Sequence, residues 1–151
     1  RDLVWFPEPM GAHDCYRAAL GDPLLLHRAF PHAARISARM SATRRDRLTA
    51  RLPMLTPPHA SGDLGSVRVE ARGAAADGER ITVIAGATGP TADLAAAVCA
   101  ATALQVVQHG VPAGVHTLGS EALAGLDLLH HATRFGVRVQ EFTGVPRPTS
   151  W

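Results

Sequence analysis

The chain contains no lysine and no asparagine, only 5% aromatic residues, two cysteines and no long hydrophobic run. Without lysine it cannot supply a Schiff-base amine, a P-loop lysine or a lysine general base. All 15 basic residues are arginines interspersed with 13 acidic residues, so the net charge is only +2. The strong basic surface typical of nucleic-acid binders is therefore missing, and we expect no nucleic-acid partner.

The scarcity of cysteine and of apolar runs also indicates where in the cell the protein is expected. Cys15 and Cys99 have no metal-ligand or redox spacing and are too few for a disulfide framework, so we expect buried thiols in a reducing, cytoplasmic setting. No apolar run approaches the ~18 residues of a membrane span, and the first residues lack a signal-peptide core, so we expect no membrane partner. Because the chain begins with Arg1, we expect a fragment or a processed product.

Strict alternation of apolar and polar residues is the main structural signal. It predicts strands at 34–40 and 136–142 and an antiparallel hairpin at 66–85, whose turn contains Asp77 and Gly78. In the hairpin, Val67 and Val69 are expected to face the core. Alternation of this kind is typical of an antiparallel sheet with one packed face.

Helical patterns occupy most of the remaining chain. They predict a helix at 43–52, an almost wholly apolar and therefore buried central helix at 91–109, and a third helix at 120–135 between a Ser120 cap and a Gly136 stop; a short helical or irregular segment is expected around 22–30. The predicted fold is one α+β domain over residues 1–151, a two-layer sandwich with helices on one face of a mainly antiparallel sheet.

The stretch "ITVIAGATGPTADLAAA", residues 81–97, resembles a dinucleotide-binding turn, with Gly86, Gly89 and Ala92 after a β-branched run. A nucleotide fold also needs a second parallel strand ending in a ribose-reading residue roughly 20 residues later. That count falls on "ALQVVQHG", which continues the helix. We therefore interpret the stretch as a strand-to-helix turn with Pro90 at the first helical position, and expect no cofactor-binding residues in this chain.

Several short stretches resemble saccharopine dehydrogenase-like oxidoreductases. They are "WFPEPMG" at 5–11, "CYRAALGDPLLLHRAFPHAARIS" at 15–37, "GVPAGVHTLGSEAL" at 110–123 and "LHHATRFGVRVQEF" at 129–142. The resemblance places the chain in the second, C-terminal domain of that family. It implies an NAD(P)-dependent parent enzyme whose cofactor-binding domain precedes this segment, which would itself hold substrate and dimer contacts and be inactive alone.

Four residues are candidates for binding a small-molecule substrate. His13 and Tyr16, with Asp14 between them, follow the Phe-Pro-Glu-Pro turn, where a loop could face a domain cleft. Arg35 and Arg39 on the polar side of a strand could fork onto substrate carboxylates, such as those of an amino-dicarboxylic acid. The alternative for both arginines is pairing with neighbours such as Glu70 or lining a subunit contact.

For other polar residues the pattern indicates structural roles. His130 and His131 are adjacent and diverge on a helix, so no metal site is expected there. Ser120 and Glu121 fit a helix cap followed by a first-turn acid. No catalytic residue is assigned.

The polar face of the expected sheet has many donors and few acceptors, and we expect it to form a homodimer across a two-fold axis. Its members are Arg35, Ser37, Arg39, Arg68, Glu70, Arg72, Arg138 and Gln140. The alternative function is a stand-alone, non-catalytic ligand-binding or dimerisation module of the same shape.

Overall fold

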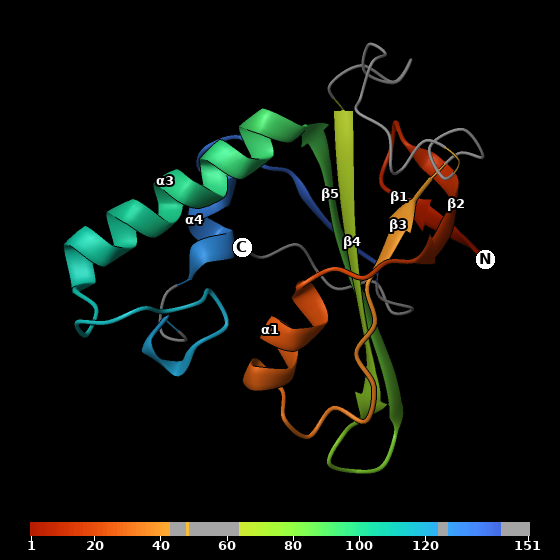
Figure 1. Cartoon of the computed structure of the whole chain (residues 1–151), viewed down its shortest axis with the longest axis horizontal. Coiled ribbons are helices and arrows are strands. Elements are labelled where there is room, and N and C mark those ends of the chain that lie inside the picture. Colours follow the sequence, from red (N-terminus) through yellow and green to blue (C-terminus); the bar gives the residue numbers. More distant parts are fainter. Residues whose placement is uncertain (43–47, 49–63, 124–126, 143–151) are drawn as a thin grey trace.

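The computed structural model describes residues 1–42, 48, 64–123 and 127–142. Over these residues the fold is α+β, with two antiparallel three-stranded sheets, ordered β1-β2-β3 and β4-β5-β6, and the three α-helices α1, α3 and α4 (Figure 1). The elements are β1 (Asp2–Phe6), β2 (Gly11–Arg17), α1 (Asp22–Ala29), β3 (Arg39–Ser41), β4 (Leu64–Ala74), β5 (Arg80–Pro90), α3 (Thr91–His109), the 3-10 turn η1 (Glu121–Leu123), α4 (Leu128–Thr133) and β6 (Val139–Phe142). The prediction of an antiparallel α+β fold is confirmed, but the single expected sheet is two sheets.

The hairpin β4–β5 is longer than predicted. Its register pairs Leu64 with Pro90 at one end and Ala74 with Arg80 at the other. At the tip the Asp77 carboxylate accepts a hydrogen bond from the Glu79 amide at 2.9 Å. Gly78 there has φ +84°, a conformation that glycine adopts without steric cost. The predicted turn chemistry is therefore confirmed.

The glycines that resemble a nucleotide-binding turn lie inside β5. Gly86 pairs with Arg68 and Gly89 with Gly65, and the helix begins at Thr91 with Pro90 as its N-cap. The strand leads directly into the helix as expected, but the glycines lie inside the strand and not in a turn, and Pro90 is the N-cap and not the first helical residue. Backbone pairing to β4 continues to Pro90, so the two glycines do not form a loop.

Close packing explains why position 86 is glycine. A Cβ added there would lie 2.8 Å from Pro7 Cγ, and Pro7 is fully buried. The turn between β1 and β2 thus rests on the middle of β5, which fixes the first sheet against the long hairpin. A larger side chain would separate the two.

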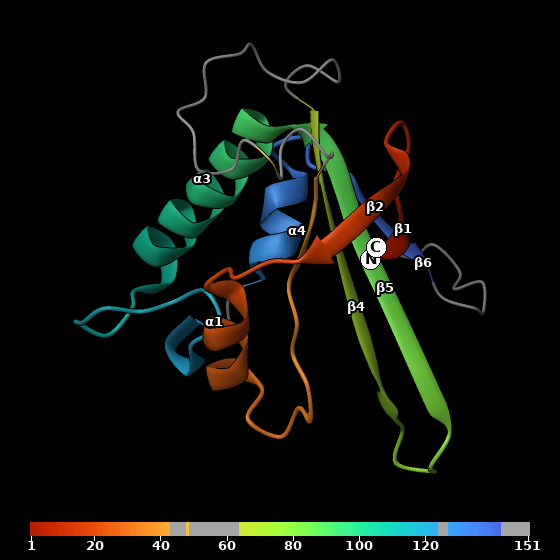
Figure 2. The same ribbon diagram turned by 45° about the vertical axis from the view of Figure 1, so that its right-hand side comes forward.

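Helices α1, α3 and α4 lie on one side of the β4-β5-β6 sheet, and the β1-β2-β3 sheet lies on its other side (Figures 1 and 2). On the helix side, Ala87 and Val139 pack against a small core formed by Ala97, Ala101, Ala132 and Val137. Among the described elements, the helices cover this face of the sheet only in part. On β4, Val67, which pairs directly with Ala87, and Val69 lie on the same face but are 59% and 58% exposed, so their expected burial is wrong.

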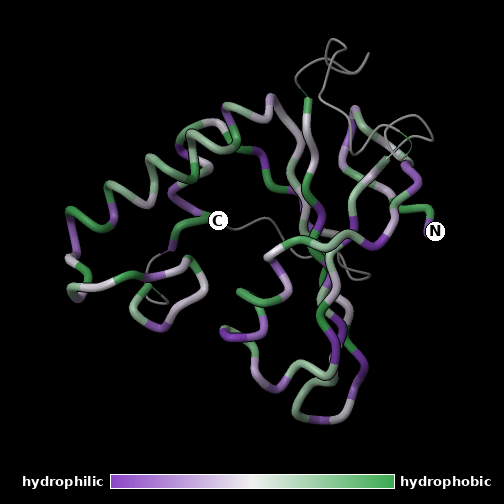
Figure 3. The backbone as a smooth tube through the Cα atoms, viewed as in Figure 1, coloured by the Kyte–Doolittle hydropathy of each residue, from purple (hydrophilic) through white to green (hydrophobic). Residues whose placement is uncertain are grey.

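Helix α3 has the predicted bounds but not the predicted environment. Its buried residues are Ala97, Ala101 and Gln105, whereas Val107 is 82% exposed. Figure 3 shows that the helix is hydrophobic along most of its length. The expectation of a largely buried central helix is wrong, because within the described chain one stripe of α3 meets α4 and the sheet. By length and composition alone α3 could also cross a membrane, a test that core helices of soluble proteins pass as well.

Other expected elements differ in extent. The strand at 34–40 is reduced to β3, which pairs through Met40 with Tyr16, and residues 34–38 precede it without strand pairing. The third helix is divided into η1 and α4, and the Asp127 carboxylate caps α4 by accepting from the His130 amide at 3.1 Å. The Ser120 hydroxyl makes no such cap: it is buried without a hydrogen-bond partner in the described structure. The helix expected at 43–52 falls outside the described residues apart from Leu48.

Candidate functional cleft

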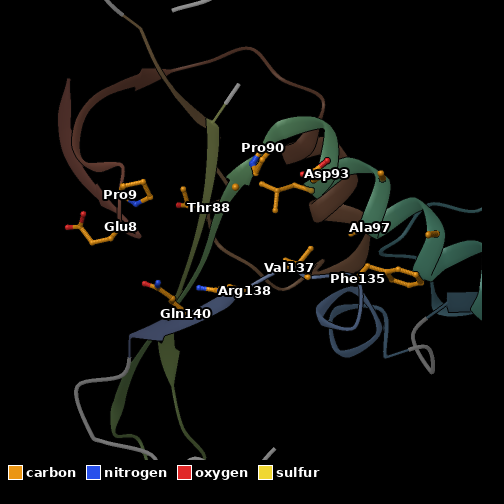
Figure 4. A pocket seen from close by; sticks show the side chains of 15 residues that line it. Glu8, Pro9, Thr88, Pro90, Asp93, Ala97, Phe135, Val137, Arg138 and Gln140 are labelled. Carbon is orange, nitrogen blue, oxygen red and sulfur yellow. The ribbon is translucent and has the colours of Figure 1, made fainter. Parts of the chain in front are cut away.

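An open cleft of about 650 Å³ lies where four segments meet: the turn between β1 and β2, the end of β5, the first turns of α3, and residues 135–140 leading into β6 (Figure 4). Its volume is in the range of small-molecule sites. The polar side chains that line it are Glu8, Thr88, Asp93, Arg138 and Gln140. We call this the Arg138 cleft.

The side of the cleft formed by β5 is fixed by hydrogen bonds. The Thr88 hydroxyl donates to the Pro7 carbonyl at 3.1 Å and lies 2.6 Å from the Ser66 hydroxyl. The Ser66 hydroxyl in turn donates to the Ala87 carbonyl at 3.1 Å. Because these bonds tie the first turn to the long hairpin, they also hold Glu8 and Pro9 at the rim of the cleft.

Arg138 is the only cationic side chain among the described residues that line the cleft. Within the described chain it forms no ion pair, and Gln140 forms no side-chain hydrogen bond. Alternation along residues 137–140 explains their placement: Val137 is buried and Val139 half-buried, while Arg138 and Gln140 are exposed on the opposite side. Figure 4 shows the ends of both polar side chains on one wall.

Two carboxylates line the other walls. Glu8 lies at the rim, and Asp93 lies in the first turn of α3, where the helix dipole favours an acid. Between them the walls are apolar, with Leu94, Phe135 and Val137 among the lining residues. The arrangement offers one cation, an amide and two separated anions around an apolar floor, which suits a small molecule with both acceptor and donor ends.

The residues predicted to bind substrate do not line this cleft. His13 and Tyr16 are three apart on β2 and therefore project from opposite faces of the first sheet. His13 Nε2 lies 3.1 Å from the Met10 carbonyl oxygen, and its ring meets that of Phe6 edge-on. The Asp14 carboxylate accepts a hydrogen bond from Arg1 Nε at 2.8 Å.

The two candidate arginines are also separate. Arg35 is exposed in the segment before β3, and Arg39 on β3 pairs with Asp2. Their expected partner Glu70 belongs to another sheet, so the expected polar face of one sheet is divided between two.

Glu70 is instead held between two arginines of its own strand. Arg68 pairs with it at 2.7 Å, and Arg72 pairs with it from the other side. Burial acts to raise the pKa of Glu70, but the hydrogen bonds and charges of the two arginines outweigh it, so the pKa is lowered.

No cluster of three or more histidine, cysteine or acidic side chains suited to a metal occurs among the described residues. His130 and His131 are neighbours on α4 with ring centroids 5.7 Å apart. Both cysteines are free thiols: Cys15 is buried as expected, but Cys99 is exposed on α3.

Sequence reasoning noticed Arg138 and Gln140 only as members of a sheet face. Their alternation with valines was visible, but nothing in the sequence indicated that Glu8 and the start of α3 would lie beside them. No protein-family model matches the chain, and neither the curated proteins nor the solved structures contain a match.

Proposed function

We propose that this chain is the substrate-side and assembly domain of a larger NAD(P)-dependent oxidoreductase similar to saccharopine dehydrogenases. The stretches quoted for that resemblance suggest the oxidoreductase class. NAD(P) would be held by a nucleotide-binding domain elsewhere in the parent protein, because Gly86 and Gly89 lie inside a paired strand. The parent would act in the cytoplasm on a small carboxylate-bearing substrate.

The observation that carries the assembly role is the large uncovered apolar surface. A chain of 151 residues can bury roughly two-thirds of its surface on folding. Yet the described core is small, and large apolar side chains stay exposed on both sheets and on α1, including Trp5 at 66% and Leu24 at 75%. Exposed apolar patches of this kind mark interaction surfaces.

A homodimer remains part of the proposal, on a different surface from the one expected. The polar face that was expected to pair is split between two sheets, and the first sheet covers part of it through Pro7. The opposite face of the hairpin presents Val67, Val69, Ile81 and Val83, all exposed and uncharged. A two-fold axis would bring this patch against itself without opposing like charges.

A stand-alone binding module is the second candidate. The observation that favours it is the Arg138 cleft itself, which combines an arginine, a glutamine and two carboxylates with apolar lining residues.

The coding sequence upstream of Arg1 and the activity of its product discriminate between the candidates. We expect the longer protein to contain a strand followed by a glycine-rich nucleotide turn, and to oxidise or reduce NAD(P)H with an amino-acid or oxo-acid substrate at 340 nm. Calorimetric titration of NAD(P) into the present chain should give no saturable binding. A start codon beside Arg1, or micromolar NAD(P) binding by this chain, would overturn the oxidoreductase-domain proposal.

A further inference from the structure

We infer that Arg138, together with Gln140, recognises a carboxylate group in the Arg138 cleft, with the carboxylates of Glu8 and Asp93 receiving a hydrogen-bond-donating or cationic end of the same molecule. The inference rests on the proposed function in taking the chain to be substrate-binding. It moves that role away from Arg35 and Arg39.

Arg138 and Gln140 both have side-chain donors that no described residue uses. A guanidinium presents several N–H groups in a planar fork that fits a carboxylate with two parallel hydrogen bonds. Arg39, by comparison, already pairs with Asp2, whereas Arg138 forms no ion pair with any described residue. Gln140, two residues on, can add an amide donor from the same wall.

The second step is the charge around the pair. Glu8 and Asp93 line the same cleft, so the one positive charge of Arg138 faces two negative charges. A phosphate dianion would be repelled by those carboxylates more than a single carboxylate would. A molecule with a carboxylate at one end and an ammonium or other donor at the other satisfies both sets of groups.

The third step is the floor of the cleft. Leu94, Phe135 and Val137 lie among its lining residues, and Val137 belongs to the buried core. This apolar surface accommodates the aliphatic part between the two polar ends, and its attachment to the core keeps the adjacent Arg138 backbone in place.

The test is a titration of the ¹⁵N-labelled chain with 5-aminopentanoate, which carries a carboxylate and an ammonium, followed by ¹H–¹⁵N correlation spectra. We expect saturable shifts at amides of residues 88–97 and 135–140, and no saturation with pentylamine, which lacks the carboxylate. Arg138→Gln should weaken the binding at least tenfold. The matched control is Arg134→Gln, four residues earlier, where an exposed arginine forms no ion pair with any described residue; it should leave the binding unchanged.

Arg138→Lys serves as the second variant, because it keeps the charge but loses the planar fork; we expect at least threefold weaker binding with an unchanged spectrum elsewhere. Shifts that do not saturate, that occur elsewhere, or that are equally affected by the Arg134 control would overturn the inference. Binding at this cleft in a protein without an upstream nucleotide domain would support the inference and refute the oxidoreductase proposal. An active oxidoreductase whose activity is unchanged by Arg138→Gln would support the oxidoreductase proposal and refute the inference about Arg138.

Discussion

Replacing Gly86 with alanine tests the packing that joins the two sheets. The new Cβ would lie 2.8 Å from Pro7 Cγ and 3.1 Å from both Pro7 Cδ and the Val67 carbonyl oxygen. Ordinary contact begins at 3.4 Å, so the neighbours would have to move by about 0.6 Å. Pro7 is fully buried and its ring is part of the backbone, so it cannot rotate away.

Overpacking of this kind costs about 1–3 kcal/mol. Replacing glycine also restricts the unfolded chain, which offsets about 0.4–1 kcal/mol. We therefore expect Gly86→Ala to lower the free energy of unfolding by about 1–2 kcal/mol, which for a chain of this size lowers Tm by about 2–8 °C. Circular dichroism melting measures the change.

Gly73→Ala is the matched control, on the partner strand of the same hairpin. A Cβ at position 73 meets nothing within 4 Å, and the φ of Gly73 lies outside the positive range. We expect this variant to be as stable as the wild type or more stable by up to about 1 kcal/mol. Equal stability of the two variants would refute the contact between Pro7 and β5 that defines the arrangement of the sheets.

Three further outcomes follow from burial and charge. The pKa of Glu70 is lowered from its ordinary value of 4.5, so its ion pairs stabilise the fold fully above that pH and lose this contribution as the pH falls through the lower pKa of the folded state. On acidification the melting temperature of the wild type should therefore fall more steeply than that of Glu70→Gln. Val98→Asp on the exposed side of α3 should change the free energy of unfolding by less than about 1 kcal/mol, whereas Ala101→Asp, at a position 1% exposed, should lower it by several kcal/mol. Urea denaturation measures both variants, and equal midpoints would contradict this orientation of the helix. Cys99 should react at once with Ellman's reagent, while Cys15, whose pKa is raised by burial and then by a neighbouring acid, should react only on unfolding; two fast thiols would contradict its burial.

Local patterns in the sequence determined the elements whose formation depends on neighbours in the chain. The Asp77-Gly78 turn and the alternation on either side of it predicted the long hairpin, because a tight turn and a two-residue period are properties of a short segment. The bounds of α3 were predictable for the same reason: an alanine-rich run without proline or glycine lies between Pro90 and Gly110.

Which face of each element is covered was decided only by the tertiary structure. The valines of β4 alternate as if they faced a core, yet Val67 stays 59% exposed although its strand partner Ala87 packs against the core under the helices. Alternation specifies two different faces but not which layer, or how much of it, lies against either one. The Arg138 cleft has the same origin, since Glu8, Asp93 and Arg138 are far apart in the sequence and meet only because Pro7 docks on Gly86 and β6 pairs with β5.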